Sequence, residues 1–153
     1  MTQRIPTKAF GALVAIAMVL GVGCSKTTSD QAKVKTVVKG FLSDTVDNRA
    51  AEACSALTGD ALRFVSSVGA VAGTTASCPD AVKTLSGLYA ADEAKALKNA
   101  KIEKVTISGD RATIAPQDIK IDYQGQSHIF PARSGGPIVV LKTDAGWKLD
   151  SLG

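Results

Sequence analysis

Aromatic side chains are scarce in this chain of 153 residues, which has one Trp, two Tyr and four Phe. Its lysines and arginines are scattered along the sequence and form no basic run. Surfaces that bind single-stranded nucleic acid combine a basic groove with aromatic rings on which the bases stack. Because both features are missing, the composition argues against a nucleic-acid-binding protein.

Motifs that hold cofactors or phosphates are also missing. The sequence contains no P-loop, no G-x-G-x-x-G, no G-x-S-x-G and no paired C-x-x-C, and it has a single histidine. We therefore expect no cofactor and assign no catalytic residue from motifs. A non-catalytic role is expected in preference to an enzymatic one.

A strongly apolar run lies near the start of the chain. Residues 9 to 23 carry no charge and follow a basic segment with Arg4 and Lys8. The run is shorter than the roughly 20 apolar residues that a membrane-spanning helix needs. A basic start, a short apolar core and small residues before a break are typical of a secretory signal peptide, which we place at residues 1 to 23. Without Arg4 and Lys8 the net charge falls from +4 to +2.

The apolar run ends in Leu20-Gly21-Val22-Gly23-Cys24, which resembles the lipobox of bacterial lipoproteins. It departs from the usual pattern because Gly21 stands where leucine is preferred, with Leu20 one step further back. The resemblance implies that Cys24 becomes the acylated N-terminal residue and that residues 24 to 29 form a polar tether. One acyl chain holds a protein only marginally, so two or three chains are expected. We expect a protein held by this lipid anchor on the extracytoplasmic face of the cell membrane.

The other two cysteines, Cys54 and Cys78, are an even pair in a chain expected to be exported. Disulfides persist outside the cytosol, so we expect these two residues to be bonded. The alternative is a metal site that adds His128 to the two sulfurs. It lacks the closely spaced ligand pairs typical of zinc sites, and the disulfide is favoured.

Helical spacing of apolar residues covers most of residues 30 to 65 and 79 to 98. We expect breaks at Asp47-Asn48 and at the turn 58–60, and a loop over most of residues 66 to 77. Pro79 suits the first turn of a helix. The apolar stripe of that helix is expected to consist of Val82, Leu85, Leu88 and Tyr89.

After residue 100 the period of the apolar residues becomes two, which indicates strands. Three hairpins are expected between residues 102 and 152, with turns at Gly109-Asp110, Gln124-Gly125 and Asp144-Ala145. In the last hairpin, Trp147 and Leu149 should face the core. Helices followed by antiparallel hairpins predict an α+β fold, in which the helices pack on one face of a curved sheet. Residues 30 to 153 should form a single domain.

Four segments carry a resemblance to a known family: FLSDTVDNRAAEACSAL, SCPDAV, VTISGDRATI and VVLKTDAGWKLDS. Together they look like the nuclear-transport-factor-2-like (ketosteroid-isomerase-like) superfamily, and most like its small exported bacterial lipoproteins. The resemblance covers roughly residues 30 to 153. It implies a cone, also seen in cystatin-like folds, that is built from a long helix, two shorter helices and a bent sheet. The open end of the cone would hold a pocket, which members of the superfamily use for catalysis, for binding or as a core.

The second hairpin supplies the candidate pocket residues. If Gln124-Gly125 is a two-residue turn, Ile121 lies opposite His128 and Ile119 opposite Phe130. Tyr123 and His128 would then share the apolar face and line a binding pocket. The competing interpretation, which we favour, is that His128 is a satisfied or partly exposed side chain, since no carboxylate on that face orients it.

Three functions remain open from the sequence. The leading one is a membrane-anchored, non-catalytic lipoprotein that binds a small apolar ligand or a partner protein of the cell envelope. The second is an enzyme of the isomerase or dehydratase kind that uses His128 and Tyr123. The third is a structural protein of the cell envelope.

Overall fold

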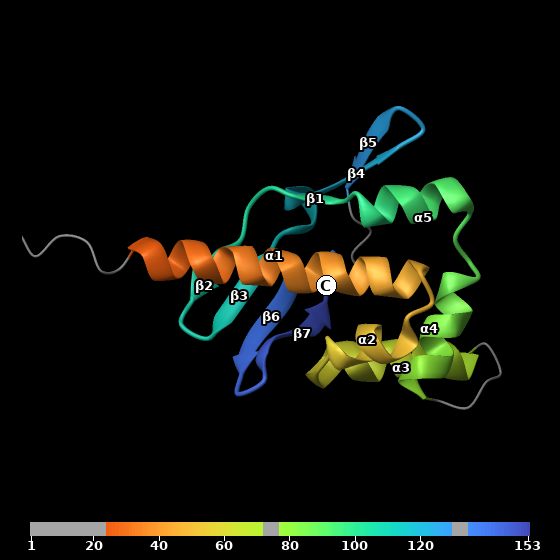
Figure 1. The fold of residues 1–153 in the computed structure, drawn as a ribbon, viewed down its shortest axis with the longest axis horizontal. Helices are drawn as coiled ribbons and strands as arrows, with labels where there is room; N and C mark the ends of the chain where they lie inside the picture. The colour runs from red at the N-terminus through yellow and green to blue at the C-terminus, as the bar shows by residue number, and fades with distance from the viewer. Residues whose placement is uncertain (1–23, 72–76, 130–134) are drawn as a thin grey trace, which may run out of the picture.

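A computed structural model describes residues 24–71, 77–129 and 135–153. Within these ranges the helices precede the strands, so the predicted α+β class is confirmed (Figure 1). The helices are α1 (Cys24–Val46), α2 (Ala50–Ser55), α3 (Gly59–Val71), α4 (Cys78–Ser86) and α5 (Ala91–Lys98). The signal peptide predicted at residues 1 to 23 lies outside the described residues.

The longest helix, α1, carries the main apolar face of the helical layer. Val34, Val38, Phe41 and Leu42 recur at helical spacing and are all buried. The helix ends at Val46, and Asn48 then has a φ of 57°, which breaks the helical path where we predicted it. Residues 24 to 29, where we expect the polar tether, belong to α1, which begins at Cys24.

Two helix boundaries differ from the prediction. Helix α3 continues to Val71, so the expected loop over residues 66 to 77 is wrong for its first part. Helix α4 starts as expected, with Pro79 in its first turn, but it ends at Ser86 before Gly87. Leu88 and Tyr89 therefore leave the predicted apolar stripe, and their exposed fractions are 69% and 37%.

All three predicted hairpins are present among the described residues. Their strands are β2 (Thr106–Ser108) with β3 (Arg111–Ile114), β4 (Ile119–Tyr123) with β5 (Gln126–Ile129), and β6 (Ile138–Thr143) with β7 (Gly146–Leu152). A short strand β1 (Lys101–Ile102) and a 3-10 turn η1 (Pro116–Asp118) were not predicted. The turn begins at a proline, which favours a bend before β4.

The strands form two sheets rather than the single curved sheet we expected. One sheet has the order β1-β4-β5 and the other has the order β2-β3-β6-β7, and all pairs are antiparallel. A β-bulge interrupts the pairing of β6 with β7 next to Val139 and Val140. Pattern alone predicts each hairpin, but it does not predict how separate hairpins join edge to edge.

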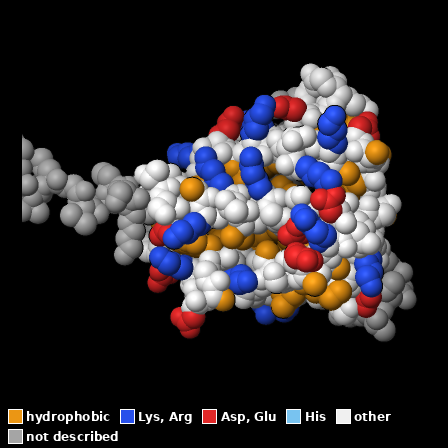
Figure 2. All heavy atoms as spheres, viewed as in Figure 1, with side chains coloured by type: hydrophobic (Ala, Val, Ile, Leu, Met, Phe, Trp, Pro, Cys, Tyr) orange, Lys and Arg blue, Asp and Glu red, His pale blue; other side chains and the backbone are white. Residues whose placement is uncertain are grey.

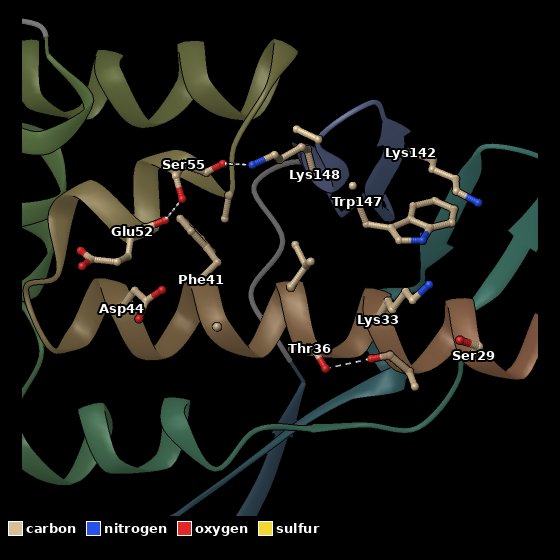
Figure 3. A pocket seen from close by; sticks show the side chains of 16 residues that line it. Ser29, Lys33, Thr36, Phe41, Asp44, Glu52, Ser55, Lys142, Trp147 and Lys148 are labelled. Carbon is tan, nitrogen blue, oxygen red and sulfur yellow. Dashed lines mark hydrogen bonds between the residues drawn. The ribbon is translucent and has the colours of Figure 1, made fainter.

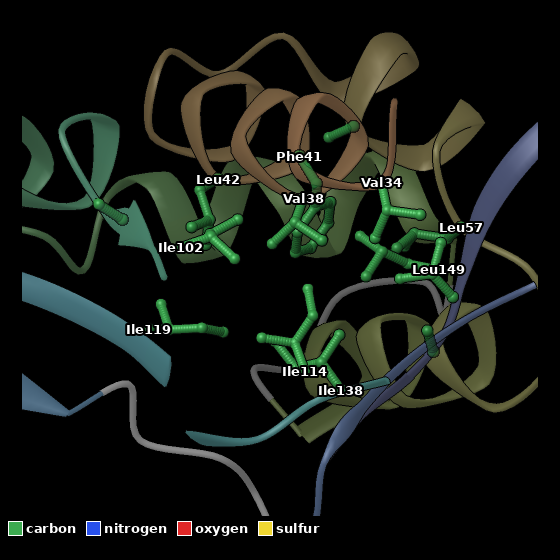
Figure 4. Close-up of a cluster of buried hydrophobic side chains, with 14 of the residues drawn as sticks. Val34, Val38, Phe41, Leu42, Leu57, Ile102, Ile114, Ile119, Ile138 and Leu149 are labelled. Carbon is green, nitrogen blue, oxygen red and sulfur yellow. The ribbon is translucent and has the colours of Figure 1, made fainter. Parts of the chain in front are cut away.

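The core lies between α1 and the sheets. Val34, Val38, Phe41 and Leu42 of α1 point towards Ile114, Ile119, Ile138 and Leu149 (Figure 4). Trp147 and Leu149 are 5% and 0% exposed, so the predicted inward face of β7 is confirmed. Leu149 also joins β7 to the segment between α2 and α3, because its N–H donates to the Ala56 carbonyl at 2.8 Å and its carbonyl accepts from Thr58 N–H at 2.7 Å.

Among the residues that the structure describes, none of the helices combines the length and the apolar character that crossing a bilayer requires.

Candidate functional site

The hairpin that we expected to line a pocket has the predicted register. Ile121 lies opposite His128, and Tyr123 lies opposite Gln126. The Tyr123 hydroxyl accepts a hydrogen bond from Gln124 Nε2 at 3.0 Å, and partial desolvation followed by the nearby carboxylates of Asp92 and Glu93 raises the pKa of Tyr123. The side chain of His128, and Phe130 altogether, lie outside what the structure describes.

An apolar cavity of about 310 Å³ lies instead among the helices, and we call it the helical pocket. It is lined by α1, α3, α4 and α5, by the turn after α4 and by the end of β7. Its lining residues are Phe41, Leu42, Thr45, Val46, Phe64, Val65, Val68, Leu85, Tyr89, Leu97 and Leu152. Tyr123 is not among them, and the side chain of His128 lies outside the described residues.

The helical pocket lies where apolar side chains of four helices meet, next to Leu152 of β7. On α1, Phe41, Leu42 and Thr45 occupy positions i, i+1 and i+4, and α3 supplies Val65 and Val68 at i and i+3. Residues at these spacings share one face of a helix. Sequence analysis predicted the apolar faces of these helices, but it did not predict that their last turns leave a cavity between them.

Thr45 is the one polar residue on the buried wall of the helical pocket. It is 5% exposed, and its Oγ1 has no hydrogen-bond partner among the described residues. Helical threonines commonly donate to the carbonyl four residues earlier. Thr36 donates in this way to the Ala32 carbonyl at 3.0 Å, and Thr84 to the Asp80 carbonyl at 3.0 Å. Thr45 makes no such bond among the described residues, although it lines the helical pocket.

Tyr89 supplies a second hydroxyl, at the edge of the helical pocket. Its side chain is partly exposed, and burial, then the charge of Glu93, raises the pKa of Tyr89. The phenol stays neutral at ordinary pH because its pKa lies above the usual value of about 10. The described lining residues of the pocket therefore offer two neutral hydroxyl groups and no charged group.

The two cysteines stabilise the wall that α4 contributes. Cys54 of α2 and Cys78 at the start of α4 are joined, with sulfur atoms 2.02 Å apart and Cα atoms 6.0 Å apart. Bonded sulfurs do not act as thiolate ligands, which removes the basis of the alternative metal site. Among the described residues there is also no group of three His, Cys, Asp or Glu that could hold a metal ion.

The start of α4 is also capped by a side chain. Ser77 caps α4 by accepting a hydrogen bond from Asp80 N–H at 3.4 Å.

A second, open groove of about 810 Å³ runs along α1 on its other side (Figure 3). Its lining residues include Phe41 and Trp147. Its charged lining residues are Lys33, Lys142, Lys148, Asp44 and Glu52. Lys148 Nζ donates to the Ser55 carbonyl across the groove.

The buried indole of Trp147 differs from the hydroxyl of Thr45 in having an anion nearby. Trp147 Nε1 meets no acceptor in good hydrogen-bond geometry among the described residues. It is nevertheless close enough to Asp30 to affect that carboxylate. Desolvation raises the pKa of Asp30, but the combined effect of Lys142, Trp147 and Lys33 is larger, so the pKa lies below its usual value. The Trp147 end of the groove therefore has the Asp30 carboxylate close to the indole.

We compared the chain with protein-family models, with curated proteins and with solved structures, and none of the three comparisons gave a match.

Proposed function

We propose that this protein is an exported, lipid-anchored binding protein that holds a small apolar ligand in the helical pocket. The observation that carries the proposal is the buried Thr45 hydroxyl, which has no partner in the described chain and lines an otherwise apolar cavity. A buried hydroxyl without a hydrogen bond costs about 1–3 kcal/mol. A ligand with one polar group would remove that cost.

The lining of the helical pocket specifies the class of ligand. Apart from Thr45 and Tyr89, the lining residues that the structure describes are aliphatic or phenylalanine, and none of them is charged. Ligand-binding cavities commonly have volumes of about 300–1,000 Å³, with a few polar groups that fix the orientation of the ligand. At about 310 Å³ the helical pocket is at the small end of this range. We therefore propose a compact, uncharged apolar molecule with one hydroxyl or carbonyl group that bonds to Thr45.

We also propose for residues 30 to 153 the cone implied by the resemblance to the nuclear-transport-factor-2-like superfamily. Members of that superfamily use the pocket of the cone for catalysis, for binding or as a core, so the resemblance is compatible with binding and does not select it. The sequence around Cys24 supports attachment to a membrane on the extracytoplasmic face. The isomerase or dehydratase alternative needs Tyr123 and His128 in one concave site. Tyr123 is not among the described lining residues of the helical pocket, so the proposal here is binding and not catalysis.

Native mass spectrometry of the protein extracted in mild detergent tests the proposal. We expect a fraction of the protein to carry an extra mass that is released by organic solvent. Val68→Trp should abolish the extra mass, because Val68 of α3 lines the helical pocket and a larger side chain fills it. Leu62→Trp is the matched control, since Leu62 lies on the same helix, is 38% exposed and does not line the pocket.

Two outcomes would contradict the proposal. One is protein that carries no extra mass under any extraction condition and gains no thermal stability from a panel of apolar alcohols and ketones. The other is an extra mass that Val68→Trp and Leu62→Trp leave equally intact, which would place the ligand elsewhere.

A further inference from the structure

Lysines gather on both sides of the exposed ridge of α1 formed by Ala32 and Thr36. The open groove on one side contains Lys33 and Lys142 at one end and the acidic residues Asp44 and Glu52 at the other. A shallow hollow on the other side is lined by Ala32, Lys35, Thr36, Lys39, Lys101 and Ile102. We call the five lysines Lys33, Lys35, Lys39, Lys101 and Lys142 the basic face, and Figure 2 shows blue side chains on both sides of α1.

The charges of the basic face are only partly neutralised within the chain. Lys33 and Lys142 share a single carboxylate, Asp30, at 3.6 Å and 3.4 Å, and that carboxylate is only 13% exposed. Lys35 Nζ donates to a backbone carbonyl, that of Glu103, at 3.2 Å.

The remaining two lysines differ in their partners. Lys101 pairs with Asp122 at 2.7 Å. Lys39 has no ion-pair partner among the described residues, and no acidic residue lines the hollow that contains it. The five lysines face the carboxylates of Asp30 and Asp122 and, near Lys101, that of Glu103, so the basic face keeps a net positive charge.

Three lysines of the basic face lie on the same helix as Cys24, the residue that we propose to carry the lipid. Cys24 is the first residue of the helix, and Lys33 and Lys39 follow on the same rigid element. A helix rises about 1.5 Å per residue, so Lys39 lies about 22 Å along the axis from Cys24. If α1 stood upright on a membrane, most of the basic face would be further from the surface than the screening length of about 8 Å at physiological salt. If α1 lay along the membrane, the whole face would reach the headgroups.

We propose that the basic face docks on anionic lipid headgroups, so that α1 lies along the surface of the membrane. The occupant is an anionic bilayer, because the lysines are spread over the length of a helix that starts at the anchoring cysteine and surround two shallow grooves rather than a deep site. Clustered lysines beside a membrane anchor bind acidic lipids by this attraction. The proposal rests on the membrane attachment proposed above, and it adds an orientation to it.

Lysine accessibility tests this orientation, and the chain offers a matched control. Lys33 and Lys83 have side chains that are 63% and 62% exposed, and each pairs with an aspartate three residues earlier. Lys83 lies on α4, at the other end of the molecule from the start of α1 (Figure 1). The lipoprotein would be reconstituted in vesicles of phosphatidylglycerol or of phosphatidylcholine. Acetylation of each lysine by an N-hydroxysuccinimide ester would then be followed by mass spectrometry.

We expect Lys33, Lys35 and Lys39 to react several-fold more slowly on phosphatidylglycerol than on phosphatidylcholine, whereas Lys83 reacts equally on both. The protection should disappear in about 1 M salt, where the screening length falls to about 3 Å. The double variant Lys33→Glu with Lys39→Glu should lose the protection of Lys35, and Lys83→Glu should keep it. Equal reactivity of Lys33 on the two lipids, or equal protection of Lys83, would overturn the proposal.

Flotation of the same samples separates this inference from the anchor. A chain that floats with both lipids but shows no selective protection of Lys33 keeps the anchor and refutes the basic face. A chain that floats only with phosphatidylglycerol and shows the protection supports the basic face and refutes the anchor. If a soluble envelope protein slows the acetylation of these lysines and lipid does not, docking on lipid is refuted.

Discussion

The carboxylate of Asp150 lies against the α-carbon of Gly59, at the first residue of α3. Asp150 is the unpaired residue of the β-bulge in β7, between Leu149 and Ser151, which pair with Val140 and Val139. A Cβ built on Gly59 would overlap Asp150 Oδ1. Bulges reorient side chains, and a carboxylate is favourable near the positive end of a helix. The bulge therefore fixes the start of a helix that lines the helical pocket.

Replacing Gly59 by alanine should destabilise the protein by about 1–2 kcal/mol, the cost of a left-handed conformation for a residue with a Cβ. Gly59 has a φ of 49°, and the Asp150 side chain would also have to move. Gly40→Ala is the control, because a Cβ there meets nothing within 4 Å and the residue lies inside α1. It should stabilise the protein by about 0.5–1 kcal/mol. Urea unfolding measures both changes, and opposite signs are the expected result.

Local pattern predicted the hairpins well because their turns are short and specific. Gly109 and Gly125 have positive φ angles of 59° and 74°, which turns of this kind require. The end of α4 was missed because the apolar spacing continues through Leu88 and Tyr89, although Gly87 ends the helix. The length of α3 was missed because residues 66 to 71 are small and carry little periodic signal.

The helical pocket could not be predicted from the sequence. Its wall brings together Phe41, Val65, Leu85 and Leu97, which come from four different helices. Each of these residues fits a buried position, and a pattern does not indicate whether side chains from separate helices meet or leave a gap. The sequence also does not indicate that the Thr45 hydroxyl lacks a hydrogen-bond partner. That property depends on which groups from other helices lie near Thr45, and only the three-dimensional structure shows this.

Replacing Thr45 by valine should stabilise the ligand-free protein by about 1 kcal/mol, because it removes a buried hydroxyl that has no partner. The same change should weaken ligand binding. Thr36→Val is the control, since Thr36 is exposed and already bonded to Ala32, and its effect on stability should be within about 0.5 kcal/mol. Thermal unfolding with and without ligand measures both effects. A loss of stability in ligand-free Thr45→Val would show that the hydroxyl has a partner within the chain.

Replacing either Cys54 or Cys78 should cost about 3 kcal/mol, from the chain entropy that a cross-link across 24 residues removes from the unfolded state. The exported protein should be lighter than its reduced form by two hydrogens, as measured by intact mass spectrometry. Cys54→Ala should also leave Cys78 as a free thiol. Full labelling of both cysteines in the folded protein would contradict the disulfide.

Asp47 should make stability fall in acid. A hydrogen bond from Lys98 is the main cause of its lowered pKa, and Ser43 and Arg49 add to the effect. A carboxyl whose pKa is lower in the folded state stabilises the protein above its unfolded pKa, and this contribution is lost as pH falls through the folded pKa. Asp47→Asn should therefore be less stable than the parent at pH 6, and the difference should vanish below the folded pKa.

Asp144→Asn is the control for this pH dependence, because Asp144 lies in an exposed hairpin turn. Its stability should follow that of the parent across the acid range, as measured by urea unfolding at each pH. A constant difference between Asp47→Asn and the parent at all pH values would contradict the role of the carboxylate.

Cys24 should carry a diacylglyceryl thioether, and the protein should sediment with membranes. Each buried acyl methylene contributes about 0.8 kcal/mol, so two long chains outweigh the attraction of a few lysines for headgroups. High salt should therefore abolish the orientation set by the basic face but leave the protein attached to the membrane. Detergent should extract the protein. Cys24→Ala should block cleavage at this position or release a soluble form, and Cys54→Ala should leave attachment unchanged. If salt alone strips the parent protein from membranes, or if Cys24→Ala remains equally tightly bound, the lipid anchor is wrong.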